Sequence, residues 1–241
     1  MRILALDTAT ELCSAALLLD EALLQREQRL ERGHAAAILP MVDELLRAAG
    51  ITLRSLTALA FGRGPGTFTG VRLAASVTQG LAFGAGLPVV PVSDLRALAQ
   101  RSLDEDVGVG RVLVCADARM AEVYWGCFED SGEGCARAYG EERVSSPDDV
   151  RLPPAWSSAA PVTGGEPTRS EVAGVGSGFI VYPQLRTLLP PPGRSRGELL
   201  PRAAEVARLA VREVLANRIL SPEQAVPVYL RNDVARVSTG T

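Results

Sequence analysis

Histidine is almost absent from this chain, since His34 is the only one among 241 residues. A Ser-His-Asp triad would have to use it, yet the sequence has no G-x-S-x-G nucleophile elbow. A zinc site would combine His34 with scattered carboxylates or thiols that lack ligand spacing. We therefore expect no metal site and no catalytic histidine. His34 is better suited to a capping or interface role near the start of a helix.

Paired cysteines and long apolar runs are also missing. The four cysteines include no C-x-x-C pair, which argues against a zinc knuckle or a redox pair and predicts buried thiols in a reducing compartment. No apolar run reaches about 18 residues, so no transmembrane helix is predicted. The short apolar run at the N-terminus is interrupted by Asp7 and Glu11, unlike a signal peptide. We expect a cytoplasmic chain with no membrane partner.

The chain also has no excess of positive charge. The net charge of −3 argues against a chain that binds nucleic acid by itself, because phosphate contacts require a basic surface. Any contact with RNA would be shared with a more basic partner. Hydrophobic residues make up 47% and charged residues 22%, which is ordinary for a globular chain of one large domain or two small ones.

Glycine is concentrated in residues 62–72, with the sequence G-R-G-P-G-T-F-T-G-V-R. This stretch lies between a predicted strand at 56–61 and a predicted helix at 70–84. Glycine permits positive φ and close approach of other backbone, and Pro65 stiffens the turn. The loop could therefore present N–H groups to an anion or to a neighbouring chain, with Thr67 or Thr69 capping the helix. The alternative is a tight strand-to-helix turn that binds nothing. Its spacing fits neither a Walker loop nor G-x-G-x-x-G.

Two predicted hairpins indicate an internal repeat. Residues 2–7 and 13–19 form the first pair, and 111–117 with 123–128 form the second. Each first strand ends at an aspartate, and such repetition is expected of a duplicated, two-lobed α/β fold. The polar residues 104–110 are the predicted boundary between the lobes. The remaining predictions are an edge strand at 25–30, helices at 34–49 (with a kink or break at Pro40), 93–101 and 202–217, a strand at 86–92, a loop at 153–170, a glycine turn at 174–178 and an extended segment at 226–231.

Four segments in this order resemble the TsaB family, also called YeaZ, of bacterial tRNA threonylcarbamoyladenosine biosynthesis proteins. They are the glycine stretch, L-A-L-D-T-A-T at 4–10, D-A-R-M-A-E-V-Y at 117–124 and P-V-Y-L-R at 227–231. The resemblance implies an actin/Hsp70/sugar-kinase-like (ASKHA) fold with two hairpin-led lobes. The N-terminal lobe would comprise residues 1–104 with the returning segment 201–241, and the second, smaller lobe residues 105–200.

The same resemblance implies a non-catalytic subunit required for tRNA threonylcarbamoyladenosine (t6A37) modification. Such a subunit binds the TsaD transferase as a heterodimer, forms a homodimer when alone, and is joined by the TsaE ATPase. It would contact tRNA only through that complex.

The catalytic paralogue TsaD carries an H-x-x-x-H metal motif directly after the strand that follows its glycine loop and helix. The matching positions here are Asp94 and Leu98. Leucine cannot ligate a metal, and one aspartate holds a metal only weakly. We therefore expect no catalytic residue and no cofactor of this type.

One residue argues against nucleotide binding. The phosphate turn of sugar kinases usually has glycine two residues after the aspartate, whereas this chain has Ala9. We expect at most a vestigial nucleotide site made of Asp7, Thr8, Thr10 and Asp117. The alternative is an active ATP-dependent phosphotransferase or ATPase in which Asp7 and Asp117 hold Mg²⁺ and nucleotide. A protease is a third, weaker alternative, because one histidine without further ligands builds neither a serine nor a metal centre.

The partner surface is predicted from the helices at 34–49 and 70–84. Placed side by side, they could pair with the same helices of a second copy or with TsaD. The residues predicted for this interface are His34, Ile38, Met41, Leu45, Val71, Ala74, Ala75 and Thr78. The alternative is that both helices merely pack on the sheet.

Overall fold

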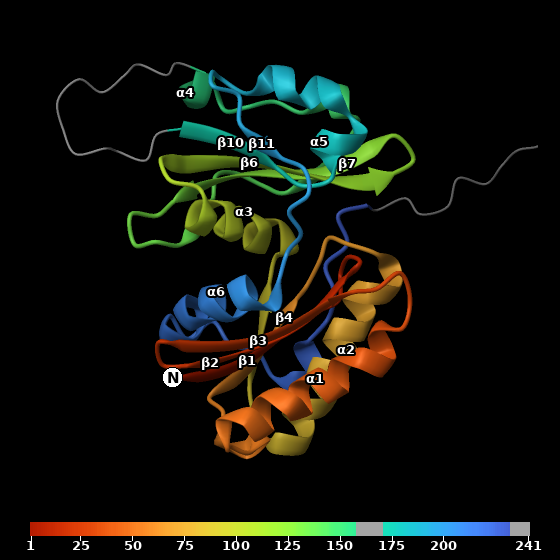
Figure 1. Ribbon diagram of the computed structural model, residues 1–241, viewed down its shortest axis with the longest axis vertical. Helices are drawn as coiled ribbons and strands as arrows, with labels where there is room; N and C mark the ends of the chain where they lie inside the picture. The colour runs from red at the N-terminus through yellow and green to blue at the C-terminus, as the bar shows by residue number, and fades with distance from the viewer. Residues whose placement is uncertain (158–170, 232–241) are drawn as a thin grey trace, which may run out of the picture.

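Two α/β lobes are stacked along the long axis of the computed structural model, which describes residues 1–157 and 171–231 (Figure 1). The first sheet has the strand order β3-β2-β1-β4-β5, and the second β11-β10-β6-β7-β8 with β9 paired to β7. In each sheet an antiparallel hairpin is joined to parallel strands on one side and to an antiparallel strand on the other. The predicted two-lobed, hairpin-led fold is thereby confirmed.

The first sheet is covered by helices on both faces because its strands are apolar on both faces. Leu4 and Leu6 of β1 belong to the core under α1 and α2, whereas Ile3 and Ala5 belong to the core under α6. Strand β3 lies at the edge and is mostly exposed and polar, as predicted. The elements of this lobe are β1 (Arg2–Asp7), β2 (Leu12–Leu19), β3 (Ala22–Arg29), α1 (His34–Ala49), β4 (Ala58–Gly62), α2 (Phe68–Ala85), β5 (Val89–Val92) and α6 (Ala203–Leu215), with short 3-10 turns η1 (Leu53–Ser55) and η4 (Pro222–Gln224).

The second lobe repeats this arrangement with shorter cover on its outer face. Helix α3 covers the inner face, while α5 and the 3-10 turn η3 lie on the outer face (Figure 1). The elements are α3 (Asp94–Glu105), β6 (Val109–Arg119), β7 (Glu122–Asp130), β8 (Ala136–Ala138), β9 (Arg143–Ser145), η2 (Pro147–Asp149), α4 (Pro154–Ser157), β10 (Glu171–Val175), α5 (Gly178–Val181), η3 (Pro183–Leu188) and β11 (Ser195–Arg196).

Helix α3 lies between the lobes. Leu95 and Leu98 pack on the second sheet, while Ala97 packs with the core under α6. Residues 104–110 contain the last turn of α3, a short connection and the start of β6. The helix therefore lies before this polar stretch in sequence yet packs mainly on the second sheet.

Two local features differ from the predictions. Helix α1 runs through Pro40 without a break, because Pro40 and Ala36 are on the exposed side, where water can replace the hydrogen bond that proline cannot donate. Gly174 and Val175 complete β10, so the glycine turn starts only at Gly176, whose φ is 101°. Residues 158–170 of the loop predicted at 153–170 lie outside the described residues.

The described residues include no helix that is both long enough and apolar enough to cross a membrane.

Candidate functional site

The glycine loop between β4 and α2 packs directly on the turn that follows β1. The N–H of Thr67 donates to the carbonyl oxygen of Ala9 at 2.8 Å. A Cβ at Gly66 would lie 2.6 Å from that same oxygen, and one at Gly70 would overlap the carbonyl oxygen of Thr8. Glycine is required at both positions because two backbones approach closely. The loop therefore packs on the turn after β1 of its own chain.

The start of α2 is held by two hydroxyl groups. Thr67 is the N-cap, and its hydroxyl accepts the N–H of Gly70 at 3.2 Å, so Thr67 rather than Thr69 caps the helix. The hydroxyl of Thr8 is buried and donates to the carbonyl oxygen of Gly70 at 2.7 Å. Thr8 thus contributes to packing between the loop and the turn.

Asp7 and Asp94 meet behind this loop. Asp7 is fully buried and accepts the N–H of Ala9 at 2.8 Å, while Asp94 is 2% exposed and accepts the N–H of Gly64. The two carboxyl groups are neighbours, since a Cβ at Gly62 would lie 2.5 Å from Oδ1 of Asp94 and 3.2 Å from Cγ of Asp7. Burial raises the pKa of Asp7 to about 6 and, together with the negative charge of Asp7, raises the pKa of Asp94 well above its ordinary value.

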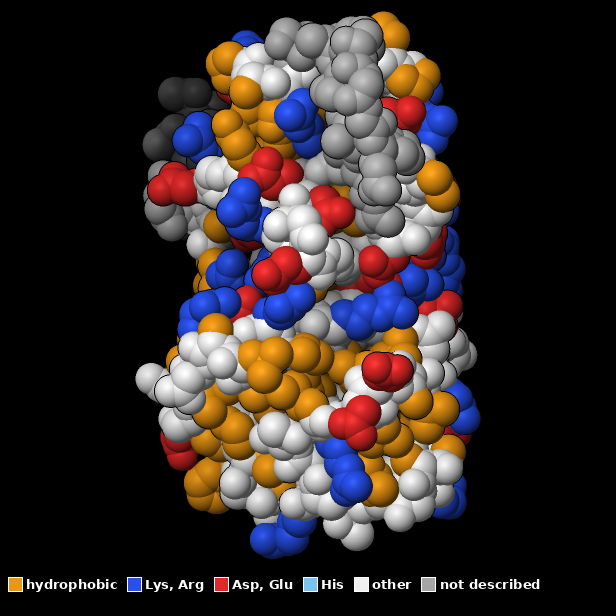
Figure 2. All heavy atoms as spheres, turned by 90° about the vertical axis from the view of Figure 1, so that its left-hand side faces the viewer, with side chains coloured by type: hydrophobic (Ala, Val, Ile, Leu, Met, Phe, Trp, Pro, Cys, Tyr) orange, Lys and Arg blue, Asp and Glu red, His pale blue; other side chains and the backbone are white. Residues whose placement is uncertain are grey.

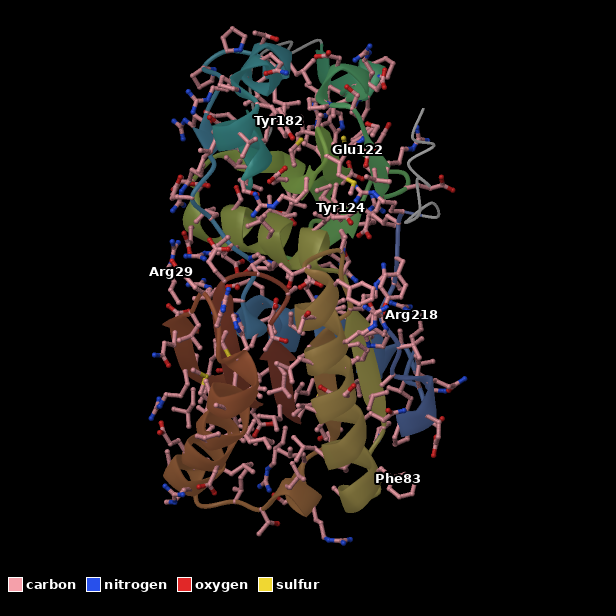
Figure 3. The ribbon with its side chains drawn as sticks, turned by 90° about the vertical axis from the view of Figure 1, so that its right-hand side faces the viewer. Arg29, Phe83, Glu122, Tyr124, Tyr182 and Arg218 are labelled. Carbon is pink, nitrogen blue, oxygen red and sulfur yellow. The ribbon has the colours of Figure 1, made fainter. Side chains whose placement is uncertain are left out.

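A pocket of about 570 Å³ lies between the lobes. Its walls come from the turn after β1, the glycine loop and α2 on one side, and from the β6–β7 turn, α5 and the C-terminal segment on the other. Side chains that carry polar or aromatic groups into its lining are Thr10, Glu11, Thr67, Phe68, Asp117, Arg119, Tyr124, Ser177, Tyr229 and Arg231. In Figure 3, Tyr124 lies on the second lobe at the level where the two lobes meet.

The structure divides the predicted nucleotide residues into two pairs. Thr10 and Asp117 line the pocket, whereas Asp7 and Thr8 are buried behind it. The carboxylate of Asp117 accepts the backbone N–H of Arg119 at 3.0 Å and the hydroxyl of Tyr182 at 3.3 Å. To hold one Mg²⁺ ion, Asp7 and Asp117 would have to face a common pocket. They do not.

The two arginines that line the pocket already have acidic partners. Arg119 is 3.3 Å from the carboxylate of Asp117, and Arg231 pairs with Glu122. A bound phosphate would therefore compete with a carboxylate for either guanidinium.

The residues predicted for the partner interface lie mostly inside the chain. Seven of them are buried in this chain's own core: Ile38, Met41, Leu45, Val71, Ala74, Ala75 and Thr78. His34 is half-buried, and its Nε2 lies 2.9 Å from the carbonyl oxygen of Thr10. The outward sides of the same helices carry Leu39 and Phe83, which are 49% and 71% exposed. In Figure 3, Phe83 projects from the lower end of α2, away from the sheet.

The positions that match the metal motif of TsaD have other roles here. Leu98 is buried in the core between α3 and the second sheet, and Asp94 is bound to Asp7 and Gly64. In the part of the chain that the structure describes, no group of three or more His, Cys, Asp or Glu side chains could hold a metal ion. The cysteines are unpaired, and burial raises the pKa of Cys13 to about 11 and of Cys127 to about 12, which keeps them as thiols.

The C-terminal segment crosses from one lobe to the other. The N–H of Val228 donates to the carbonyl oxygen of Arg63 at 2.8 Å, and Arg231 donates to the carbonyl oxygen of Ala118 at 3.1 Å. Residues 228–231 thus contact both lobes. Tyr229 lies beside Phe68, with the ring centres 6.4 Å apart, and both rings line the pocket.

Sequence reasoning missed the pairing of Asp94 with Asp7. An aspartate directly after Ser93 is also what the first turn of any helix favours, because it lies near the positive end of the helix dipole. The sequence therefore contains no signal that would distinguish the two roles.

Comparison with known proteins gives consistent results. The family model for TsaD, tRNA N6-adenosine threonylcarbamoyltransferase, matches residues 27–169. The chain is 39% identical over 235 residues to the tRNA threonylcarbamoyladenosine biosynthesis protein TsaB of Escherichia coli, covering 98% of this chain and 96% of that protein. It is 36% identical over 251 residues to the TsaB of Haemophilus influenzae, covering 97% and 95%.

Two solved structures from Pseudomonas aeruginosa have the same fold. One is described as YeaZ and has a TM-score of 0.84, 42% identity and coverage of 95% of this chain and 99% of that chain. The other is described as an uncharacterized protein with similarity to peptidase YeaZ, and has a TM-score of 0.85, 43% identity and the same coverage. The similarity extends over nearly the full length of this chain, of the two TsaB proteins and of the two solved structures. The chain therefore belongs to the TsaB (YeaZ) family.

Proposed function

We propose that this chain acts in tRNA threonylcarbamoyladenosine (t6A37) biosynthesis as a non-catalytic subunit that binds a TsaD-type transferase. The observation that carries the proposal is the full-length similarity to proteins named for this pathway. The buried Leu98 at a position where TsaD has a metal-binding histidine supports a non-catalytic role. In this proposal the chain works in the cytoplasm, forms a homodimer when alone, is joined by the TsaE ATPase in the complex, and contacts tRNA only through it.

The first test separates a subunit from an enzyme. The isolated chain should neither transfer threonylcarbamoyl groups nor hydrolyse ATP above a blank, and adding it to TsaD and TsaE of the same organism should permit t6A formation. Asp117 is the best probe for the ATPase alternative because its carboxylate lines the pocket, whereas Asp7 is buried in a structural pair. ATP turnover that disappears in Asp117→Ala would favour the phosphotransferase.

We propose the outward sides of α1 and α2 as the partner surface. Leu39 and Phe83 leave apolar surface exposed there, and nothing lies within 4 Å of a Cβ placed at Gly80 or Gly84. A second helix could therefore approach α2 closely along this side. Ala75→Arg would not test this surface, because Ala75 is 3% exposed and an arginine there would disrupt the core of the single chain.

The partner surface is tested with Phe83→Asp and Gly80→Arg. Each should abolish co-elution with TsaD in size-exclusion chromatography and weaken the homodimer, while the far-UV circular dichroism stays unchanged. The matched control is Val107→Asp, which places the same charge on an exposed apolar residue after α3. If both helix variants co-elute as the unchanged protein does, the interface lies elsewhere, although the role in t6A formation could still hold.

A further inference from the structure

The Asp7–Asp94 pair brings together segments that are far apart in the sequence. Asp7 ends β1, Asp94 begins α3, and Gly64, which donates to Asp94, belongs to the glycine loop. Gly62 adjoins both carboxyls, because a Cβ there would lie 2.5 Å from Oδ1 of Asp94 and 3.2 Å from Cγ of Asp7. The two carboxyls thus form a single contact on which three segments depend.

One proton shared between the two carboxyl groups would satisfy all four carboxyl oxygens. Oδ1 of Asp7 and Oδ2 of Asp94 each accept a backbone N–H. Oδ2 of Asp7 and Oδ1 of Asp94 have no donor from elsewhere in the described chain. Two bare carboxylates in contact without water would repel strongly, so the two oxygens require a proton between them.

The charged neighbours of the pair in the described chain are two acidic side chains and the histidine of α1. Glu205 of α6 and Glu142, in the segment before β9, are the acidic neighbours, and each has its own arginine, Arg202 and Arg63. His34 of α1 lies near Asp7, but its Nε2 is next to the carbonyl oxygen of Thr10.

The thiol of Cys13 on β2 is the remaining titratable neighbour of Asp7. Within residues 1–157 and 171–231, no arginine forms an ion pair with either carboxyl of the pair. The backbone groups that meet these carboxyls are N–H donors, which suit a hydrogen-bonded acid pair and not a cation.

We propose that Asp7 and Asp94 hold one proton between them as a pH-sensitive latch, which fastens the glycine loop and the start of α3 to the end of β1 and loosens when the proton is lost. The proton resides on Oδ1 of Asp94 and is donated to Oδ2 of Asp7. Its loss leaves two negative charges in one buried contact. Ala9 and the glycine loop, which form part of the wall of the interlobe pocket, are then no longer held in place by the aspartate pair.

The direction of the pH effect follows from the raised pKa values. An unfolded chain releases both protons near the ordinary pKa of 3.8, whereas in the folded chain the pKa of Asp7 is raised to about 6 and the pKa of Asp94 well above its ordinary value. The pair therefore stabilises the fold most at low pH, and its contribution declines as pH rises. While the folded state holds one proton more than the unfolded chain, the folding equilibrium constant falls about tenfold per pH unit from this pair alone.

The test compares the unchanged protein with Asp94→Asn. The amide can donate its N–H to Asp7 and accept from Gly64 with its oxygen, so it imitates the protonated pair at every pH. Urea unfolding at a series of pH values from about 6 upward should give a ratio of folding constants, unchanged protein over variant, that falls with rising pH, by about tenfold per pH unit while the folded pair keeps its proton. Hydrogen exchange in peptides covering residues 62–70 should quicken with rising pH more in the unchanged protein than in the variant.

Asp7→Asn is the second arm, because its amide can donate to Asp94 while its oxygen accepts from Ala9. Asp149→Asn is the matched control, since it makes the same chemical change at an exposed carboxyl and should leave the ratio constant. A ratio that does not change with pH for either Asp94→Asn or Asp7→Asn overturns the latch. The proposed role in t6A formation is unaffected by that outcome, because this measurement uses the isolated chain.

Discussion

Gly62 shows how a single missing side chain controls the packing behind the glycine loop. The residue ends β4 and directly adjoins both carboxyl groups of the aspartate pair. Its φ is not positive, so the backbone there could accommodate any residue. What excludes a larger residue is the space occupied by Asp7 and Asp94.

We expect Gly62→Ala to lower the free energy of unfolding by about 1–3 kcal/mol, because the new methyl group must push the carboxyls apart. Gly80→Ala is the matched control. It makes the same change in the middle of α2, where nothing lies within 4 Å, and should raise stability by about 0.5–1 kcal/mol. Urea denaturation measures both. If the two variants shift in the same direction, crowding at Gly62 is not the controlling factor.

At the scale of the element, α2 depends on its N-cap residue. The sequence offered two threonines for this position. Thr67 has extended backbone and accepts the N–H of Gly70, while Thr69 lies inside the first turn and is exposed. Position in the turn, and not residue type, decides which hydroxyl can reach a free N–H.

Thr67→Ala should therefore destabilise the chain by about 1 kcal/mol, because one N–H at the start of α2 loses its partner. Thr69→Ala should change stability by less than about 0.5 kcal/mol, as expected of an exposed substitution. The midpoints of chemical denaturation distinguish the two. Equal losses would mean that capping by Thr67 contributes little.

At the scale of the whole molecule, ion pairs join the two lobes. All 25 basic residues other than His34 are arginine, since the sequence has no lysine. Figure 2 shows basic and acidic side chains interleaved at the level where the lobes meet, above a mostly apolar area of the first lobe. Glu105 of α3 contacts Arg196 at 2.9 Å and Arg202 at 3.2 Å.

Arg202 also pairs with an acidic residue at the start of its own helix, α6. Its guanidinium donates to both carboxylate oxygens of the fully buried Glu205, at 2.7 and 3.0 Å. Such two-point contact suits the planar guanidinium and not an ammonium group.

Arg202→Met should cost about 3–5 kcal/mol at neutral pH, because Glu205 would remain buried without a partner. Adding Glu205→Gln should recover much of the loss. The single variant should also regain stability relative to the unchanged protein on acidification, since protonation of Glu205 removes the unpaired charge. Thermal unfolding across the pH range checks this. A loss that is independent of pH and not relieved by the second substitution would contradict it.

The sequence by itself determined the elements and much of the loop chemistry. Short apolar runs separated by turns predicted both hairpins, the three-to-four spacing predicted the bounds of α1, and the clustered glycines predicted a close backbone approach that Gly66 and Gly70 make. These features follow from interactions within a few residues, which periodicity and turn chemistry record. The four motif segments were likewise sufficient to identify the family.

Only the tertiary structure decided which surfaces and which partners these elements use. The small residues Ala74 and Ala75 suit a helix that packs on a sheet as well as one that packs on another helix, so the sequence could not show that they face the chain's own core. Asp7 and Asp94 meet because the parallel strands β1, β4 and β5 end at one edge of the sheet, where α3 then begins. Contacts of this kind depend on how distant segments are brought together, and no local pattern records them.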